Sequence, residues 1–215
     1  MQAVLFDLDG TLVDTAPDLG YALNLQRARH GLPFLPDDTI RPYASHGSKG
    51  LLEIGFGLQP ADHAFEAMRE EYLSLYTEVM TRQPRLFDGM DETLAGIESR
   101  GLRWGIVTNK PRRFTLPIVE ALKLSGRAAA VISGDDAPQP KPSPATLLLA
   151  CERMQLAPEQ AIYVGDAERD MQAGQAAGMT TLVALFGYLS DEDQPLQWGA
   201  HACITHPQAL LDYLP

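Results

Sequence analysis

The stretch Ala3–Thr11 constrains the fold of this chain more than any other. Its first part, Ala3–Phe6 (AVLF), is a short continuous apolar run, which is typical of a β-strand buried on both faces. Asp7 and Asp9 follow at once, and Gly10 then allows a sharp turn. Ligands of open α/β sheets bind beyond the carboxyl ends of the strands. The two aspartates are therefore predicted to stand where such a fold carries out its chemistry.

A helical segment follows directly after Asp14. Residues 16–29 carry apolar side chains at helical spacing, a short helical piece follows Pro36, and a longer helix is expected from Pro60 to Tyr76. No strand signal occurs between residues 16 and 82. We therefore expect residues 15–82 to form an all-helical cap, inserted into a core made of residues 1–14 and 83–215.

Strand and helix signals alternate through the rest of the chain. Strands are predicted at residues 103–108, 129–133, 161–164, 180–184 and 203–205, interleaved with helices at 91–100, 113–122, 144–154, 171–177 and 207–213. Repeated strand–helix units imply a parallel sheet with right-handed crossovers and helices on both faces. The predicted fold class is α/β: a doubly wound, Rossmann-like parallel sheet core with the inserted helical cap.

Two further segments place polar side chains near strand or helix ends. Thr108 and Asn109 close the strand at 103–108 and bring a hydroxyl group and turn N–H groups to the carboxyl edge of the sheet. Lys141 lies between two prolines just before the helix at 144–154. The prolines restrain its backbone beside a helix N-terminus, and this placement favours contact with an anion.

Two carboxylates follow the strand at 161–164. Asp166 comes directly after Gly165, and Asp170 lies four residues later. Either one could cap a helix or supply its acidic first turn. Beside Asp7 and Asp9, however, they would make a cluster of like charges that needs a cation. Because carboxylate oxygens without His or Cys ligand spacing suit Mg²⁺, we expect Mg²⁺ at this edge.

The net charge of −11 argues against nucleic acid or an anionic membrane as a partner. The only cysteines, Cys151 and Cys203, are too few for a disulfide framework. The chain enters a strand almost from its first residue, without the pattern of a signal peptide. We therefore expect a cytoplasmic protein that is a monomer or a weak homodimer.

The stretch Asp7–Thr15 (DLDGTLVDT) resembles the first motif of the haloacid dehalogenase-like hydrolase superfamily. The segments around Thr108, Lys141 and Asp166 resemble its three further motifs, in the same order. The likeness covers nearly the whole chain and is greatest to phosphoglycolate phosphatase-type members, which carry a small helical cap. It implies a Mg²⁺-dependent phosphomonoester hydrolase that acts on a small phosphorylated metabolite.

The resemblance also implies catalytic roles. Asp7 would be the nucleophile that forms an aspartyl-phosphate, and Asp9 would serve as general acid and then as general base. Thr108 and Lys141 would stabilise the transferring phosphoryl group, with Asn109 beside them in the substrate site. An acid at position 9 favours phosphoryl transfer over dehalogenation, because a halide leaves without a proton.

The metal ligands are implied in the same way. Asp7 and Asp166 would bind Mg²⁺ through their side chains, and Asp9 through its backbone carbonyl group. Asp170 would belong to the outer shell of the ion. Such an arrangement would supply the local positive charge that an acidic chain needs to bind a phosphate ester.

The cap segment Ser45–Lys49 corresponds to the part of the family that faces the substrate. Lys49, and after it His46, would reach the end of the substrate remote from the phosphate group. The segment departs from the usual family pattern, so several substrates stay open: phosphoglycolate, a sugar phosphate, an amino-sugar phosphate such as N-acetylmuramate 6-phosphate, and pyrophosphate. The alternative classes are a β-phosphoglucomutase-like mutase, a phosphonate-cleaving enzyme in which Lys49 would form a Schiff base with the substrate, and a non-catalytic protein on the same scaffold.

Overall fold

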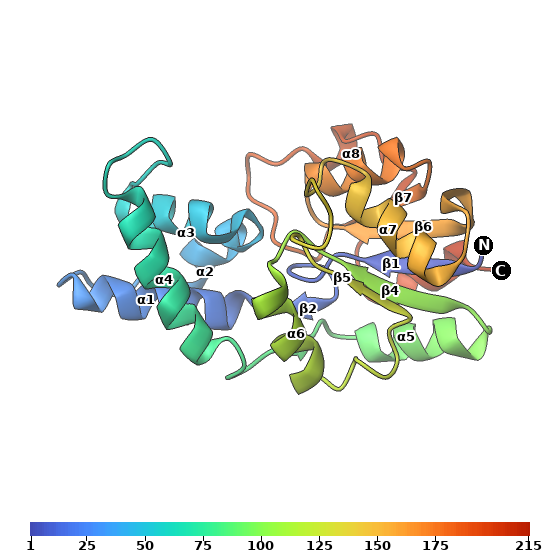
Figure 1. The fold of residues 1–215 in the computed structure, drawn as a ribbon, viewed down its shortest axis with the longest axis horizontal. Coiled ribbons are helices and arrows are strands. Elements are labelled where there is room, and N and C mark those ends of the chain that lie inside the picture. The colour runs from blue at the N-terminus through green and yellow to red at the C-terminus, as the bar shows by residue number, and fades with distance from the viewer.

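A computed structural model describes residues 1–215, and its centre is a six-stranded sheet (Figure 1). All neighbouring strands of this sheet run parallel. The predicted doubly wound parallel sheet is thus confirmed. In spatial order the strands are β5 (Ala130–Ile132), β4 (Arg103–Val107), β1 (Ala3–Phe6), β6 (Ala161–Gly165), β7 (Thr180–Ala184) and β8 (Ala202–Ile204).

Helices cover both faces of the sheet. One face packs against α5 (Met90–Ser99), α6 (Arg112–Ala121) and the 3₁₀ segment Pro207–Tyr213, and the other against α7 (Ala145–Met154) and α8 (Glu168–Ala176). The strand β1 supplies both apolar clusters, because its side chains alternate between the two faces. Val4 and Phe6 pack on the α5 side, while Ala3 and Leu5 pack on the α7 side.

A separate group of helices lies beside the sheet, on the left of Figure 1. It comprises α1 (Ala16–Arg29), α2 (Asp37–Ile40), the 3₁₀ segment Arg41–His46, α3 (Gly47–Phe56) and α4 (Phe65–Val79). These helices share an apolar cluster of their own, which Phe114 and Tyr188 join from the core. We keep the division into a core and a cap of residues 15–82 as a proposal, which this separate cluster supports. No helix is both long and apolar enough to span a membrane.

Two details around the helical group differ from the sequence-based expectation, and the helix expected at residues 207–213 is a 3₁₀ segment. A small antiparallel sheet pairs β2 (Val13–Asp14) with β3 (Arg85–Leu86), where the chain enters and leaves the helical group. The helix expected from Pro60 begins only at Phe65. The reason lies in Asp62, whose carboxylate accepts a hydrogen bond from the Gln59 N–H at 2.7 Å and holds the chain in turns before the helix.

Candidate active site

Three neighbouring strands bring the predicted residues to one edge. Because β1 lies between β4 and β6, the residues that follow these strands meet at the carboxyl end of the sheet. Asp7 follows β1, Thr108 follows β4 and Asp166 follows β6. All three are buried, with exposed fractions of 3%, 2% and 1%. The local sequence explains the placement, since each apolar run stays in the sheet and the first polar residue emerges at its end.

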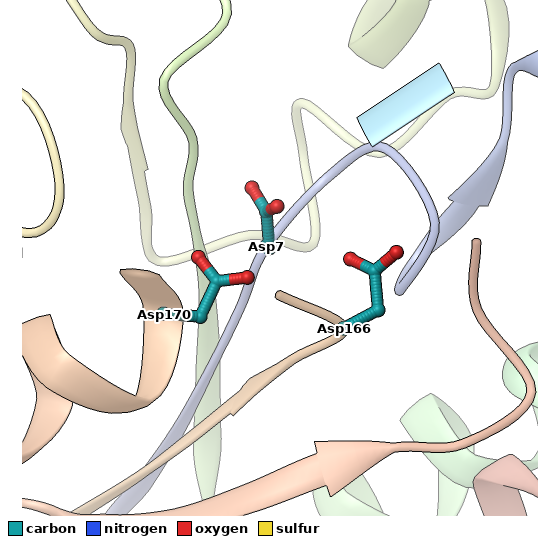
Figure 2. Close-up of side chains that lie close together, drawn as sticks. All are labelled: Asp7, Asp166 and Asp170. Atoms are coloured by element: carbon teal, nitrogen blue, oxygen red, sulfur yellow. The ribbon is translucent and has the colours of Figure 1, made fainter. Parts of the chain in front are cut away.

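The carboxylates of Asp7, Asp166 and Asp170 converge on one space, the last of them from the first turn of α8 (Figure 2). One oxygen from each lies within 4.8 Å of the others. Oδ1 of Asp7 is buried, and the Lys141 ammonium group lies 2.9 Å from it. A cluster of three carboxylates, which offers only oxygen ligands, is suited to a hard divalent cation. The residues present therefore fit a metal ion of the Mg²⁺ type.

The electrostatics of the cluster lead to the same conclusion. Burial, together with the charges of Asp170 and Asp7, raises the pKa of Asp166 to about 7. Burial likewise raises the pKa of Asp7, although Lys141 opposes this effect. Neighbouring carboxylates that are difficult to ionise together become easier to ionise when a cation lies between them. The site thus has a deficit of positive charge that a metal ion would fill.

Lys141 is the cation of the chain that contacts these carboxylates directly, while Arg169 adds a second positive charge nearby. Its Nζ lies 2.7 Å from Oδ1 of Asp170 and 2.9 Å from Oδ1 of Asp7, and it donates to the Tyr163 hydroxyl at 2.7 Å. Burial acts to lower the pKa of Lys141, but Asp170 and Asp7 raise it above its usual value. The backbone of Lys141 is fixed by the side-chain amide of Asn109, which accepts from its N–H at 2.8 Å and donates to its carbonyl at 2.9 Å.

Asp170 is occupied by its own hydrogen bonds. Its Oδ2 accepts from the Ala167 N–H at 3.1 Å, and its Oδ1 accepts from the Tyr163 hydroxyl at 3.3 Å in addition to the contact with Lys141. Both oxygens therefore have partners within the protein. This geometry agrees with a supporting position for Asp170 behind Lys141.

Asp9 is held by a lysine that the sequence analysis did not select. Nζ of Lys110 donates to Oδ1 of Asp9 at 3.0 Å and to Oδ2 at 3.3 Å, and the Thr15 hydroxyl donates to Oδ1 at 2.5 Å. The N–H of Lys110 also donates to the Thr108 hydroxyl at 3.1 Å. The sequence held one indication that Lys110 belongs to the site, because it lies two residues after Thr108 in the second motif.

The carboxylate of Asp166 accepts hydrogen bonds from three other segments. Two of the donors, Ser45 and Tyr188, were not among the site residues predicted from the sequence. Oδ1 accepts from the Thr11 hydroxyl at 3.2 Å, and Oδ2 accepts from the Ser45 hydroxyl at 2.7 Å and the Tyr188 N–H at 3.0 Å. Ser45 belongs to the helical group, and its carbonyl accepts from Arg169 at 2.7 Å. The helical group thus touches the carboxylate cluster directly.

A cleft of about 780 Å³ opens between the helical group and the sheet edge. Asp7, Asp9, Thr108 and Asn109 line it from the core, whereas Lys141, Asp166 and Asp170 are buried behind its wall. The opposite wall carries the predicted cap residues His46 and Lys49, together with Ser48, Glu53 and Arg69. Every site residue expected from the sequence therefore lies at or directly behind this one cleft.

Known proteins are similar to this chain over nearly its whole length. Residues 4–184 match the sequence profile of the family described as haloacid dehalogenase-like hydrolase. The chain is 40% identical to an N-acetylmuramic acid 6-phosphate phosphatase of Pseudomonas aeruginosa, covering 100% of this chain and 95% of the relative. It is 42% identical to a phosphoglycolate phosphatase of Xanthomonas campestris, with 97% and 94% covered.

Solved structures show the same fold over the full length. A haloacid dehalogenase-like family hydrolase from Streptococcus pneumoniae superposes with a TM-score of 0.84 at 25% identity, covering 100% of this chain and 99% of the other. The match extends through the sheet and the helical group alike, because essentially all residues of both chains are included. On the profile match and the identities above, this chain belongs to the haloacid dehalogenase-like hydrolase family.

Proposed function

We propose that this protein is a Mg²⁺-dependent phosphomonoester hydrolase that works through an aspartyl-phosphate on Asp7. One observation carries the proposal: Asp7 lines the cleft and at the same time belongs to the carboxylate cluster. Its carboxylate can therefore meet a phosphate ester from the cleft while a cation and Lys141 lie beside it. The phosphatase names of the full-length relatives support the same reaction class.

The first step transfers the phosphoryl group to the enzyme. A carboxylate oxygen of Asp7 attacks phosphorus and forms a new P–O bond, while the bond to the ester oxygen breaks. Asp9, two residues away in the same loop, donates a proton to the departing alkoxide. The Thr108 hydroxyl and the Lys141 ammonium group stabilise charge on the phosphoryl oxygens, which is the main source of rate acceleration in such transfers.

The second step releases phosphate. A water molecule attacks phosphorus, Asp9 accepts its proton, and the bond between phosphorus and the Asp7 oxygen breaks. We propose that Asp7 and Asp166 hold Mg²⁺ by side chain and Asp9 by its backbone carbonyl, with Asp170 supporting the site through Lys141. When bound, the ion neutralises phosphoryl oxygens and orients them for in-line attack.

The substrate is proposed from the shape and charge of the cleft. Its volume of about 780 Å³ lies within the range of roughly 300–1,000 Å³ that holds drug-sized ligands, and is larger than a two-carbon acid needs. Lys49 and Arg69 place two positive charges on the wall opposite Asp7, against the one negative charge of Glu53. Both features suit a bulky phosphate ester with a second anionic group. We therefore propose N-acetylmuramic acid 6-phosphate as the first candidate and phosphoglycolate as the second.

The remaining partners are proposed on general grounds. The net charge of −11 supports a protein that binds neither nucleic acid nor anionic membranes. We propose that it acts on a free metabolite in the cytoplasm. A monomer or weak homodimer is our proposal for its oligomeric state. Light scattering across a range of protein concentrations measures this state directly, and a stable higher oligomer would contradict it.

A panel of phosphorylated metabolites, assayed for phosphate release with purified protein and Mg²⁺, tests the proposed function. We expect N-acetylmuramic acid 6-phosphate to give the highest kcat/KM, with phosphoglycolate, sugar phosphates and pyrophosphate below it. No phosphate release from any ester, with Asp7→Asn as the inactive reference, would refute the phosphatase. Interconversion of glucose phosphates without phosphate release would instead identify a mutase.

A further inference from the structure

The contact between Lys110 and Asp9 carries a further inference, which rests on the proposed role of Asp9 as general acid and base. Lys110 belongs to the loop after β4, and Asp9 to the loop after β1. The two side chains are only 7% and 15% exposed, although both residues line the cleft. An ion pair so enclosed is much less screened by water than a surface pair. The position of the Lys110 ammonium group can therefore determine the orientation of the Asp9 carboxylate.

Lys110 contacts both oxygens of Asp9. The distances from Nζ are 3.0 Å to Oδ1 and 3.3 Å to Oδ2, so the carboxylate is held from one side in a defined orientation. The Thr15 hydroxyl supplies the only other hydrogen bond to the Asp9 side chain, and it reaches Oδ1 alone. Without Lys110, the carboxylate could therefore turn about its own bonds while keeping the contact with Thr15.

Lys110 is itself held by both parts of the molecule. Its Nζ lies 4.8 Å from the ring centroid of Tyr76, which belongs to α4 in the helical group. Its carbonyl accepts hydrogen bonds from the Gly134 N–H at 3.0 Å and the Thr115 hydroxyl at 3.1 Å. The lysine backbone is thus fixed by the core, and its ammonium group lies between Asp9 and an aromatic face of the cap.

We propose that Lys110 is a positioning residue for Asp9. It orients the carboxylate toward the leaving oxygen, and the Tyr76 ring keeps its ammonium group in place when the cap lies over the cleft. Misplacing a catalytic group by about 1 Å can cost on the order of a hundredfold in rate. The role differs from that of Lys141, which lies beside Asp7; no ion pair joins Lys110 to Asp7.

Substitution of Lys110 tests this role with two esters that differ in their need for a proton. The p-nitrophenolate of p-nitrophenyl phosphate leaves without protonation, whereas the alkoxide of N-acetylmuramic acid 6-phosphate needs it. For Lys110→Met we expect kcat/KM for N-acetylmuramic acid 6-phosphate to fall roughly tenfold to a hundredfold, and that for p-nitrophenyl phosphate to change by less than about threefold. Lys110→Arg, which keeps the charge and can contact both oxygens, should recover most of the loss. Lys123→Gln alters an exposed lysine outside the cleft and should change neither value.

A double substitution separates positioning from direct contact with the phosphoryl group. If Lys110 acts through Asp9, adding Lys110→Met to Asp9→Asn should cause no more than about a twofold further loss. Equal losses for both esters, or additive losses in the double variant, would overturn the inference and assign Lys110 to the phosphoryl group itself. Unchanged kinetics with a lower melting temperature would overturn it in favour of a purely structural ion pair. Failure of the wild-type protein to hydrolyse either ester would instead count against the proposed function.

Discussion

The backbone N–H of Tyr188 donates a hydrogen bond to Oδ2 of Asp166 at 3.0 Å, so a loop residue after β7 fixes a carboxylate of the cluster. The hydroxyl group of Tyr188 lies at the start of the helical group. There it accepts from the N–H groups of Thr15 at 2.7 Å and Ala16 at 2.9 Å, and donates to Asp14 at 2.9 Å. One buried side chain therefore connects the carboxylate cluster to the entry of the cap.

Replacing Tyr188 by Phe separates these two contacts. The variant keeps the backbone N–H to Asp166 but leaves the N–H groups of Thr15 and Ala16 without a partner. Each buried donor left unpaired costs about 1–3 kcal/mol, so we expect the loss of two partners to lower the free energy of unfolding by about 2–6 kcal/mol. Denaturant unfolding measures it, and calorimetry should find Mg²⁺ affinity unchanged within about threefold. A tenfold loss of Mg²⁺ affinity at unaltered stability would contradict this division of roles.

Binding of Mg²⁺ should depend on pH through Asp166. In the metal-free protein its pKa is raised to about 7, mainly by burial, so a proton competes with the ion at lower pH. We expect Mg²⁺ affinity to be nearly constant above about pH 8 and to fall by roughly tenfold per pH unit well below 7. Calorimetric titrations between pH 5.5 and 8.5 measure this, and a flat profile would contradict it.

The same raised pKa affects the stability of the metal-free protein. Because the ordinary value is 3.8, the folded state binds more protons through Asp166 than the unfolded state between about pH 4 and 7. This contribution to the free energy of unfolding is therefore fully present below pH 4 and lost as the pH rises through 7. Asp166→Asn, unfolded by denaturant in the presence of a chelator, should lack that part of the pH dependence. If the free energy of unfolding of the variant depends on pH as that of the wild type does, another group is responsible.

Much of the site could be predicted from the sequence because its residues follow recognisable backbone signals. Asp7 and Asp166 each follow an apolar strand, and Lys141 is restrained by two prolines, so the pattern along the chain already placed them. Lys110 could not be found in this way. Its partner Asp9 lies 101 residues away, and their contact depends on how far a flexible side chain reaches.

The missed parts of the fold have physical reasons as well. The strands β2 and β3 have two residues each, too few for an alternating pattern to be visible. Tyr188 contacts Asp166 through its backbone, for which no side-chain type is required. Ser45 reaches Asp166 only because the helical group packs against the sheet edge. These contacts are set by tertiary packing, which a single sequence does not display.

Asp9→Asn should reduce catalysis according to the leaving group. The amide cannot donate a proton to an alkoxide, while a nitrophenolate leaves without one. We expect kcat/KM for alkyl phosphates to fall on the order of a hundredfold or more, and that for p-nitrophenyl phosphate to fall far less. Parallel assays of the two esters measure the difference. Equal losses would remove Asp9 from the role of general acid.

Lys49→Ala should alter substrate preference and leave the chemistry unchanged. Lys49 is exposed on the cap wall of the cleft, so its charge acts on the remote end of the substrate in ground and transition states alike. Because solvent screens an exposed charge, we expect KM for N-acetylmuramic acid 6-phosphate to rise only about threefold to tenfold at constant kcat. Hydrolysis of p-nitrophenyl phosphate is the matched control. A lower kcat for both esters would show that Lys49 acts elsewhere.

The central claim is that Asp7 becomes covalently phosphorylated. The Asp9→Asn variant should accumulate this intermediate with p-nitrophenyl phosphate, because nitrophenolate leaves unaided while the water that releases phosphate lacks its base. Borohydride reduces an aspartyl-phosphate to homoserine, which mass spectrometry of the N-terminal peptide identifies. We predict homoserine at position 7 in enzyme quenched during turnover, and none when Asp7→Asn is added. Unmodified Asp7 in the quenched variant, or modification of another residue, would contradict the account.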